Sequence, residues 1–297
     1  TITPMFTPRN NQMNKAAAMF LAMSCVADVS AQPTHEHDRG SRATSGYADV
    51  NGLRMYYELH GAGEPLVLLH GGGSTITTTF GAILPDLARH HRVIAVELQA
   101  HGHTADRGTP LSFEQDADDV AELLRVLEVD SADVFGFSNG GTTAMYLAIR
   151  HPEKVRRLVL ASALCKRDGV PQQFWTFMAQ ATPESMPQAY KDAYRAVAPD
   201  PGQLDAMGTK CAQRMIHFAD VPDADLRSIQ APALIVIGDR DVMTPEHAVF
   251  MHRMLPNSRL AIIPGGHGDY IGEITTHRPD GSYDAFALPL IERFLEH

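Results

Sequence analysis

The stretch VFGFSNGGTTAMYLAIRHP, residues 134–152, carries the strongest signal in this chain. Apolar residues run directly into Ser138, which has Gly136 and Gly140 two positions to either side, and a helical pattern follows at once. A serine in such a turn between a buried strand and a helix is held in a strained conformation that exposes its hydroxyl group. Glycine is needed at the flanking positions because side chains there would collide with neighbouring backbone. The pattern predicts a nucleophilic Ser138; the alternative is a serine that only caps the helix.

A serine nucleophile needs a general base, and a histidine late in the chain fits that role. The loop IIPGGHGDY places His267 between glycines, directly after the last predicted strand. His247 and His252 fall on a predicted helix, and His277 lies in a polar loop with no strand end to position it. His267 is therefore the predicted base.

The imidazole of such a base needs an acceptor that fixes its tautomer and stabilises its protonated form. The segment LIVIGDRDVMTP offers Asp239 and Asp241 at the end of the preceding predicted strand. We predict that Asp241 is the catalytic acid. Asp239 is the alternative and is expected to serve the turn.

Two preorganised N–H groups are also needed to stabilise the oxyanion that forms during acyl transfer. The backbone N–H of Asn139, the residue after the nucleophile, is the first candidate. The second comes from the glycine-rich segment after the apolar run PLVLL, where Gly72 is the first choice and Gly73 the alternative. Gly73 is in addition a predicted substrate-binding residue.

Strand and helix patterns alternate along most of the chain, which predicts an α/β fold with a mostly parallel sheet flanked by helices. An antiparallel hairpin is expected at residues 47–61, because Asn51-Gly52 suits a type I′ turn. The other expected strands are 65–73, 91–98, 132–138, 155–162, 231–239 and 258–266, and the expected helices are 80–90, 112–129, 139–151, 245–255 and 283–297.

Residues 163–229 break this alternation, since they contain no strong strand pattern but many methionines and aromatic residues. We expect a helical cap there, inserted before the strand that carries the catalytic acid and lying over the carboxyl ends of the strands. Such a cap favours an apolar, adaptable pocket wall. The predicted substrate-binding residues in it are Phe174, Trp175, Met178 and Met215. The core then comprises residues 47–162 and 230–297.

The N-terminal segment is expected to direct export. Lys15 precedes the apolar run AAAMFLAMSCVA, and small residues before position 32 suit a cleavage site after Ala31. Residues 1–31 are thus predicted to be an extension and signal peptide, and residues 32–46 a flexible leader. The expected location is periplasmic or extracellular, or cytoplasmic if this segment is not a signal.

The composition of this 297-residue chain limits the classes of partner that it can bind, because its formal net charge is −10. Such a charge disfavours binding to nucleic acid or to an anionic membrane, and no stable membrane association is expected once the signal is removed. The fifteen histidines are scattered, so neither a metal nor another cofactor is expected. Cys165 and Cys211 could pair in an oxidising compartment or remain free thiols.

Taken together, these motifs resemble those of α/β-hydrolase-fold serine hydrolases of the carboxylesterase and lactonase type. The resemblance runs from about Tyr47 onward and implies the catalytic roles assigned above, with residues 163–229 as the variable cap that sets specificity. Where relatives often read D-x-R-G-H-G, this chain has Glu97-Leu98-Gln99-Ala100-His101-Gly102. The segments that carry it are LLHGGGS, ELQAHGHTAD, GFSNGG, HPEKVRRLVLAS, PALIVIGDRDVMTP and IPGGHGDY.

The expected activity is hydrolysis of a small-molecule ester or lactone through an acyl-enzyme on Ser138. Export and the methionine-rich cap make a macrocyclic lactone of the macrolide type one possible substrate. A C–C bond hydrolase or a perhydrolase would use the same triad, and a ligand-binding protein could retain the fold without the chemistry. The sequence leaves the acyl and alcohol groups and the oligomeric state open.

Overall fold

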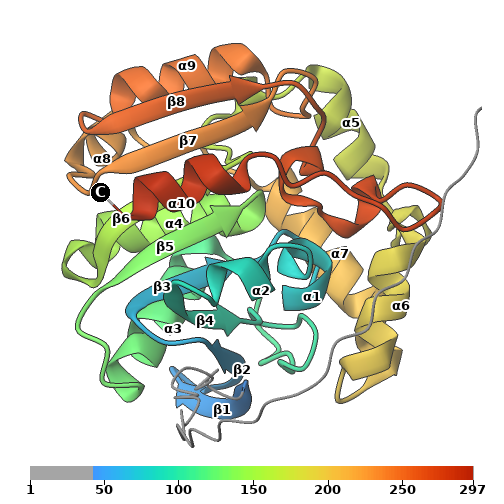
Figure 1. The fold of residues 1–297 in the computed structure, drawn as a ribbon. Helices are drawn as coiled ribbons and strands as arrows, with labels where there is room; N and C mark the ends of the chain where they lie inside the picture. The colour runs from blue at the N-terminus through green and yellow to red at the C-terminus, as the bar shows by residue number, and fades with distance from the viewer. Residues whose placement is uncertain (1–42, 297) are drawn as a thin grey trace, which may run out of the picture. The chain divides into compact units, whose positions relative to one another are not determined.

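A computed structural model describes residues 43–296, and its centre is an eight-stranded sheet with the order β1-β2-β4-β3-β5-β6-β7-β8 (Figure 1). The predicted signal peptide and the part of the predicted leader up to residue 42 lie outside the described residues. The strands are β1 (Thr44–Val50), β2 (Leu53–His60), β3 (Glu64–Leu69), β4 (His91–Val96), β5 (Ala132–Phe137), β6 (Val155–Ala161), β7 (Ala233–Gly238) and β8 (Ser258–Ile263).

The sheet is mostly parallel, as the alternating pattern predicted. From β4 to β8 every neighbouring pair is parallel, while β1 with β2 and β2 with β4 are antiparallel. Asn51 and Gly52 join β1 to β2 with φ angles of 48° and 80°, the positive values that a type I′ turn requires. β1 begins at Thr44, so residues 44–46, expected in the flexible leader, pair with β2 instead.

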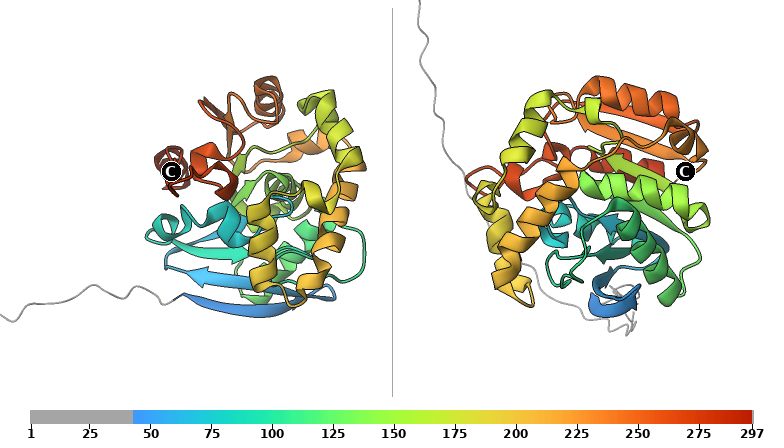
Figure 2. Two further views of the ribbon diagram at one scale, coloured as in Figure 1. Left: turned by 90° about the vertical axis from the view of Figure 1, so that its right-hand side faces the viewer. Right: turned by 180° about the vertical axis from the view of Figure 1, so that it is seen from behind.

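Helices cover both faces of the sheet, and alternate residues of each strand pack against one layer or the other. Val67 and Leu69 of β3 pack in the core under α3 (Phe113–Val126), α4 (Asn139–Arg150), α8 (Asp223–Ser228) and α9 (Pro245–Met254). Leu66 and Leu68 face the opposite core, under α1 (Ile76–Phe80), α2 (Leu84–Leu87) and α10 (Leu288–Glu296). Seen from behind, α3 and α4 lie in front of the sheet (Figure 2).

The helix expected over residues 80–90 is instead two short helices. α1 ends at Phe80, with Gly81 as its C-cap, and α2 begins only at Leu84. Pro85 lies in the first turn of α2, where its missing N–H group costs no hydrogen bond. Proline is tolerated there but not in the interior of a longer helix, which explains the break.

Between β6 and β7 the chain contains helices and no strand. α5 (Gln172–Gln180), α6 (Gln188–Val197) and α7 (Leu204–Ile216) gather on the side toward which the arrowheads of β7 and β8 point (Figures 1 and 2). α8, although within the predicted cap range, packs with α4 and α9 on a face of the sheet. The cap over the strand ends is thus built from α5, α6 and α7.

Short 3-10 helices occupy several connections. They are η1 (Pro152–Lys154), η2 (Arg167–Gly169), η3 (Pro183–Ser185), η4 (Pro201–Gln203), η5 (Asp269–Ile271) and η6 (Ile274–Thr276). Within residues 43–296, no helix combines the length and apolar character needed to cross a membrane.

Candidate active site

Ser138 occupies a sharp turn between the end of β5 and the start of α4. Its φ and ψ angles are 54° and −120°, a conformation that costs free energy for a residue other than glycine. A Cβ atom on Gly136 would lie 2.2 Å from the carbonyl oxygen of Gly140, and one on Gly140 would lie 2.0 Å from that of Leu69. The side chain of Ser138 makes no capping hydrogen bond to α4. The turn therefore needs both glycines and leaves the serine hydroxyl group unused by the helix.

His267 and Asp241 are joined by a hydrogen bond at the ends of two neighbouring strands. Nδ1–H of His267, in the loop after β8, donates to Oδ1 of Asp241, in the loop after β7, over 2.7 Å. Because Nδ1 carries this hydrogen, Nε2 is the nitrogen that can accept a proton. His267 and Ser138 line the same cavity, although no hydrogen bond joins the two side chains in this structure.

Ser162 and Tyr270 hold the buried carboxylate of Asp241 from its other side. Oγ of Ser162 donates to Oδ2 of Asp241 over 2.5 Å, and Oη of Tyr270 lies 2.6 Å from the same Oγ. The single hydroxyl hydrogen of Ser162 is directed to Asp241, so the Tyr270 hydroxyl group donates to Ser162. No motif in the sequence singled out either residue, since they are an ordinary serine after β6 and a tyrosine in η5.

The interactions between Asp241 and His267 favour an ionised carboxylate on Asp241 and a protonated imidazole on His267. Burial raises the pKa of Asp241, but His267 and the hydrogen bonds from His267 and Ser162 outweigh burial, so the pKa is lowered. Burial likewise opposes protonation of His267, yet the charge and hydrogen bond of Asp241 overcome it, and the pKa of His267 is raised above 6.5. Asp241 is thus suited to stabilise an imidazolium on His267.

Two backbone N–H groups are available beside Ser138 for an oxyanion. Neither the N–H of Gly72 nor that of Asn139 makes a hydrogen bond among the described residues, and Asn139 is the first residue of α4, where helix N–H groups have no internal partner. The two residues adjoin each other, since a Cβ on Gly72 would lie 2.2 Å from Nδ2 of Asn139. A side chain at position 72 would therefore displace the amide of Asn139.

Gly73, the alternative donor, is excluded by a hydrogen bond of its own. Its N–H donates to Nε2 of His101 over 3.0 Å, and Nδ1–H of His101 donates to the carbonyl oxygen of Gln99 over 2.8 Å. Burial lowers the pKa of His101 well below 6.5, so the ring stays neutral and can accept this hydrogen bond. His101, from the segment that departs from the usual D-x-R-G-H-G, thus holds the glycine loop in place.

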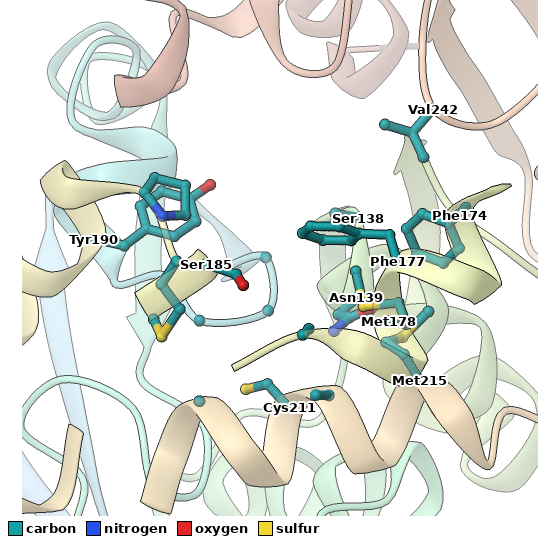
Figure 3. Close-up of a pocket in the computed structure, with 18 of the residues that line it drawn as sticks. Ser138, Asn139, Phe174, Phe177, Met178, Ser185, Tyr190, Cys211, Met215 and Val242 are labelled. Carbon is teal, nitrogen blue, oxygen red and sulfur yellow. The ribbon is translucent and has the colours of Figure 1, made fainter. Parts of the chain in front are cut away.

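A cavity of about 380 Å³ lies between the elbow and the cap. Ser138 and Asn139 form part of its base, and side chains of α5, α6 and α7 surround it (Figure 3). The predicted residues Gly73, Phe174, Met178 and Met215 line this cavity. Phe177 and Val242, which are 51% and 38% exposed, lie at its opening. Further lining residues that the sequence did not single out are Ser185, Met186, Tyr190 and Met243.

Trp175 does not line the cavity, so its prediction as a substrate-binding residue is wrong. The indole is buried in the core, where Nε1–H donates to the carbonyl oxygen of Arg167 over 2.9 Å and the ring packs near Phe218. Consecutive helix residues point about 100° apart, so Trp175 projects to one side of the stripe formed by Phe174, Phe177 and Met178 and packs into the core instead. A count of aromatic residues could not distinguish these faces.

The alternative histidines and the alternative aspartate make other contacts and do not line the cavity. His247 is buried, accepts a hydrogen bond from the N–H of Cys165, and has its pKa lowered to about 4 by burial. His252 contacts Ser258, and His277 donates to the carbonyl oxygen of Gly272. Asp239 accepts from the N–H of Gly265 over 2.9 Å and so serves the turn.

Both candidate cysteines are free thiols. Cys165 is buried in the core beneath α4, and Cys211 borders the cavity with its Sγ 3.3 Å from Nε2 of His101. Between residues 43 and 296 no cluster of three or more His, Cys, Asp or Glu side chains is placed to bind a metal ion.

Residues 64–210 match the family model described as alpha/beta hydrolase fold. The chain is 29% identical over 250 residues to the serine hydrolase BPHL of Homo sapiens, an alignment that covers 76% of this chain and 81% of that protein. Over 225 residues it is 29% identical to 2-hydroxy-6-oxo-2,4-heptadienoate hydrolase of Pseudomonas putida, covering 68% of this chain and 81% of that protein.

A solved structure with the same fold is Est816, described as an N-acyl homoserine lactone degrading enzyme. It is 25% identical, with a TM-score of 0.60, and the match covers 76% of this chain and 95% of that chain.

Proposed function

We propose that the chain, which has the α/β-hydrolase fold, is a serine hydrolase that cleaves carboxylic esters or lactones. The observation that carries the proposal is one constellation: a strained serine faces the cavity that His267 also lines, and His267 is bound through Nδ1 to the buried Asp241. Each part has the role that acyl transfer requires.

The reaction proceeds through an acyl-enzyme. Oγ of Ser138 attacks the substrate carbonyl carbon while Nε2 of His267 takes the hydroxyl proton. The N–H groups of Gly72 and Asn139 stabilise the oxyanion that forms. The C–O bond to the alcohol then breaks, and the alcohol leaves with the proton from His267. Water, deprotonated by His267, attacks the acyl-enzyme and releases the carboxylic acid and Ser138.

The cavity lining favours a substrate without a negative charge. No lysine or arginine lines the cavity, and its largest apolar side chains are those of four methionines and three phenylalanines. The Pseudomonas putida relative is named for a heptadienoate, a carboxylate, whose burial in such a cavity would be unpaired and costly. This supports an ester or lactone over a carboxylate-bearing C–C hydrolase substrate. A macrocyclic lactone is a second candidate, because the apolar opening at Phe177 and Val242 lets a large ligand extend beyond the cavity.

Fluorophosphonate labelling tests the reaction class. We expect stoichiometric modification of Ser138, identified by peptide mass spectrometry, and none in Ser138→Ala. Ser185→Ala is the matched control, since Ser185 lines the same cavity outside the triad. A wild-type protein that does not react, or a modified Ser138→Ala, would overturn the proposal and favour a binding protein.

A substrate panel then tests the class of acyl group. It contains p-nitrophenyl esters of increasing chain length, simple and macrocyclic lactones, an anionic C–C substrate, and hydrogen peroxide as an alternative acyl acceptor. We expect uncharged esters or lactones to have the highest kcat/KM. A higher value for the anionic C–C substrate would refute the ester and lactone assignment.

A further inference from the structure

Glu273 is a buried carboxylate that the proposed mechanism does not use. It is 1% exposed, and it forms no ion pair with any lysine, arginine or histidine of the described residues. Burying an ionised carboxylate without a cation is costly unless hydrogen bonds compensate for the lost water. A residue kept in this state beside an active site calls for a physical explanation.

Both carboxylate oxygens of Glu273 accept hydrogen bonds, one of them as the N-cap of η6. Oη of Tyr190 donates to Oε1 over 2.7 Å, and the N–H of Thr275 donates to Oε2 over 2.8 Å. Oγ1 of Thr275 donates to the same Oε2. Every partner is a donor, which matches a group that only accepts.

Glu273 is packed directly against the loop that carries His267. The N–H of Glu273 donates to the carbonyl oxygen of Gly268 over 3.2 Å, and a Cβ on Gly268 would lie 2.6 Å from Cβ of Glu273. Gly268 follows His267 directly in the chain and has a φ angle of 86°. This close backbone contact keeps the carboxylate next to the catalytic loop.

Two further carboxylates, Asp239 and Asp269, belong to the loops around His267, and both are less buried than Glu273. Asp239 and Asp269 accept hydrogen bonds from the N–H groups of Gly265 and Gly266, and Arg240 is 79% exposed. The remaining groups are neutral: the hydroxyl groups of Tyr190 and Tyr270 and the ring of Phe137, whose centroid is 4.7 Å from that of His267. Asp241 and Glu273 are the two charges that favour protonated His267.

We propose that Glu273 is a second carboxylate that stabilises the imidazolium form of His267, and that Tyr190 of α6 holds its side chain and shields it from water. The inference rests on the proposed role of His267 as general base. Glu273 touches neither substrate nor Ser138, so it is a positioning residue that acts through His267. Because Tyr190 belongs to the cap and also lines the cavity, the cap contributes to the electrostatics of the triad as well as to the substrate pocket.

NMR titration of the His267 ring protons in the full chain tests this proposal. We expect the pKa of His267 to fall in Glu273→Gln, because the negative charge of a buried carboxylate packed against the His267 loop is removed. Glu246→Gln, an exposed change of equal charge in the first turn of α9, should leave it unchanged. Should Glu273→Gln not fold, Glu273→Met is a second neutral variant of similar size.

A His267 pKa that is the same in wild type and in the neutral variant overturns the proposal. The acid limb of Ser138 labelling by fluorophosphonate should move to lower pH by the same amount, and Glu273→Asp should restore most of the wild-type profile. A wild-type protein that never labels refutes the hydrolase assignment alone, because the titration still reports whether Glu273 acts on His267.

Discussion

At the scale of single residues, neighbouring groups restrict the backbone at Ser138, determine which N–H groups nearby remain free and bind both carboxylate oxygens of Asp241. Gly136 and Gly140 leave room for a turn that no side chain would permit. His101 accepts a hydrogen bond from the N–H of Gly73, so the N–H groups without a hydrogen bond beside Ser138 are those of Gly72 and Asn139. Ser162, itself bound by Tyr270, donates to one oxygen of Asp241, and the other oxygen accepts from His267.

The two aspartates after β7 should differ sharply in their importance. Asp241→Asn removes the charge bound to His267 and favours the wrong imidazole tautomer, so we expect kcat for p-nitrophenyl butyrate to fall by about 10³- to 10⁴-fold. Asp239→Asn weakens only a turn hydrogen bond to Gly265 and should change kcat by less than about threefold. Equal losses in the two variants would contradict the assignment of the acid. Circular dichroism of both proteins controls for folding.

The pH dependence of kcat/KM follows from the raised pKa of His267. The base must be neutral to accept the Ser138 proton, so activity is lost as pH falls through its pKa. Asp241 raises that pKa above 6.5, and the midpoint of the acid limb is therefore expected above pH 6.5. Initial rates measured at low substrate between pH 4.5 and 9 give the midpoint. A midpoint below 6.5 would contradict the electrostatic account.

At the scale of elements, the cap helices use opposite faces for different tasks. α5 presents Phe174, Phe177 and Met178 to the cavity while Trp175 anchors it to the core. α7 presents Gly208, Cys211, Ala212 and Met215 to the same cavity. The helical pattern predicted the helices, but each residue's direction depends on which face the core covers.

The absence of a side chain at Gly208 leaves space for Met186, whose position affects the room left for a substrate in the cavity. A Cβ there would lie 2.8 Å from Sδ of Met186, the flexible side chain that also approaches Gly73. Gly208→Ala should therefore push Met186 into the cavity and lower kcat/KM for octanoyl esters about tenfold relative to acetyl esters. The added helix propensity should raise stability by up to about 1 kcal/mol. The double variant Gly208→Ala, Met186→Ala should recover octanoyl hydrolysis; a persistent loss would rule out this steric explanation.

At the scale of the whole molecule, the negative net charge and the lining of the cavity are both expected to disfavour anionic substrates. The formal net charge is −10 and no cationic side chain of lysine or arginine lines the cavity. Glu273 and Asp241 add buried negative charge near His267. Anionic substrates thus meet unfavourable electrostatics both during approach and in the bound state.

Neutral and anionic esters of equal size should therefore be distinguished. We expect kcat/KM for a p-nitrophenyl hemisuccinate to be at least about tenfold below that for p-nitrophenyl pentanoate. Val242→Lys places a cation at the opening and should reduce this preference, since Val242 is exposed there. Val242→Gln is the neutral control. Equal rates for the two esters in the wild-type protein would show that cavity charge does not select the substrate.

Local patterns along the sequence determined the strands, the hairpin and the turn at Ser138. The apolar runs, the Asn51-Gly52 turn and the Gly-x-Ser-x-Gly segment depend on neighbours within a few residues, so the strands, the hairpin and the elbow could be predicted. The order of strands and helices also led to the sheet, because parallel strands need helical connections. These are properties of short segments.

Only the tertiary structure decided which distant residues meet. The hydrogen bond between Tyr190 and Glu273 joins residues 83 positions apart, and that between Ser162 and Tyr270 joins residues 108 apart. The inward direction of Phe174 against that of Trp175, and the choice of Gly72 over Gly73, depend on packing against other elements. The physical reason is that local conformation follows from nearby residues, whereas the environment of a side chain follows from how whole elements pack.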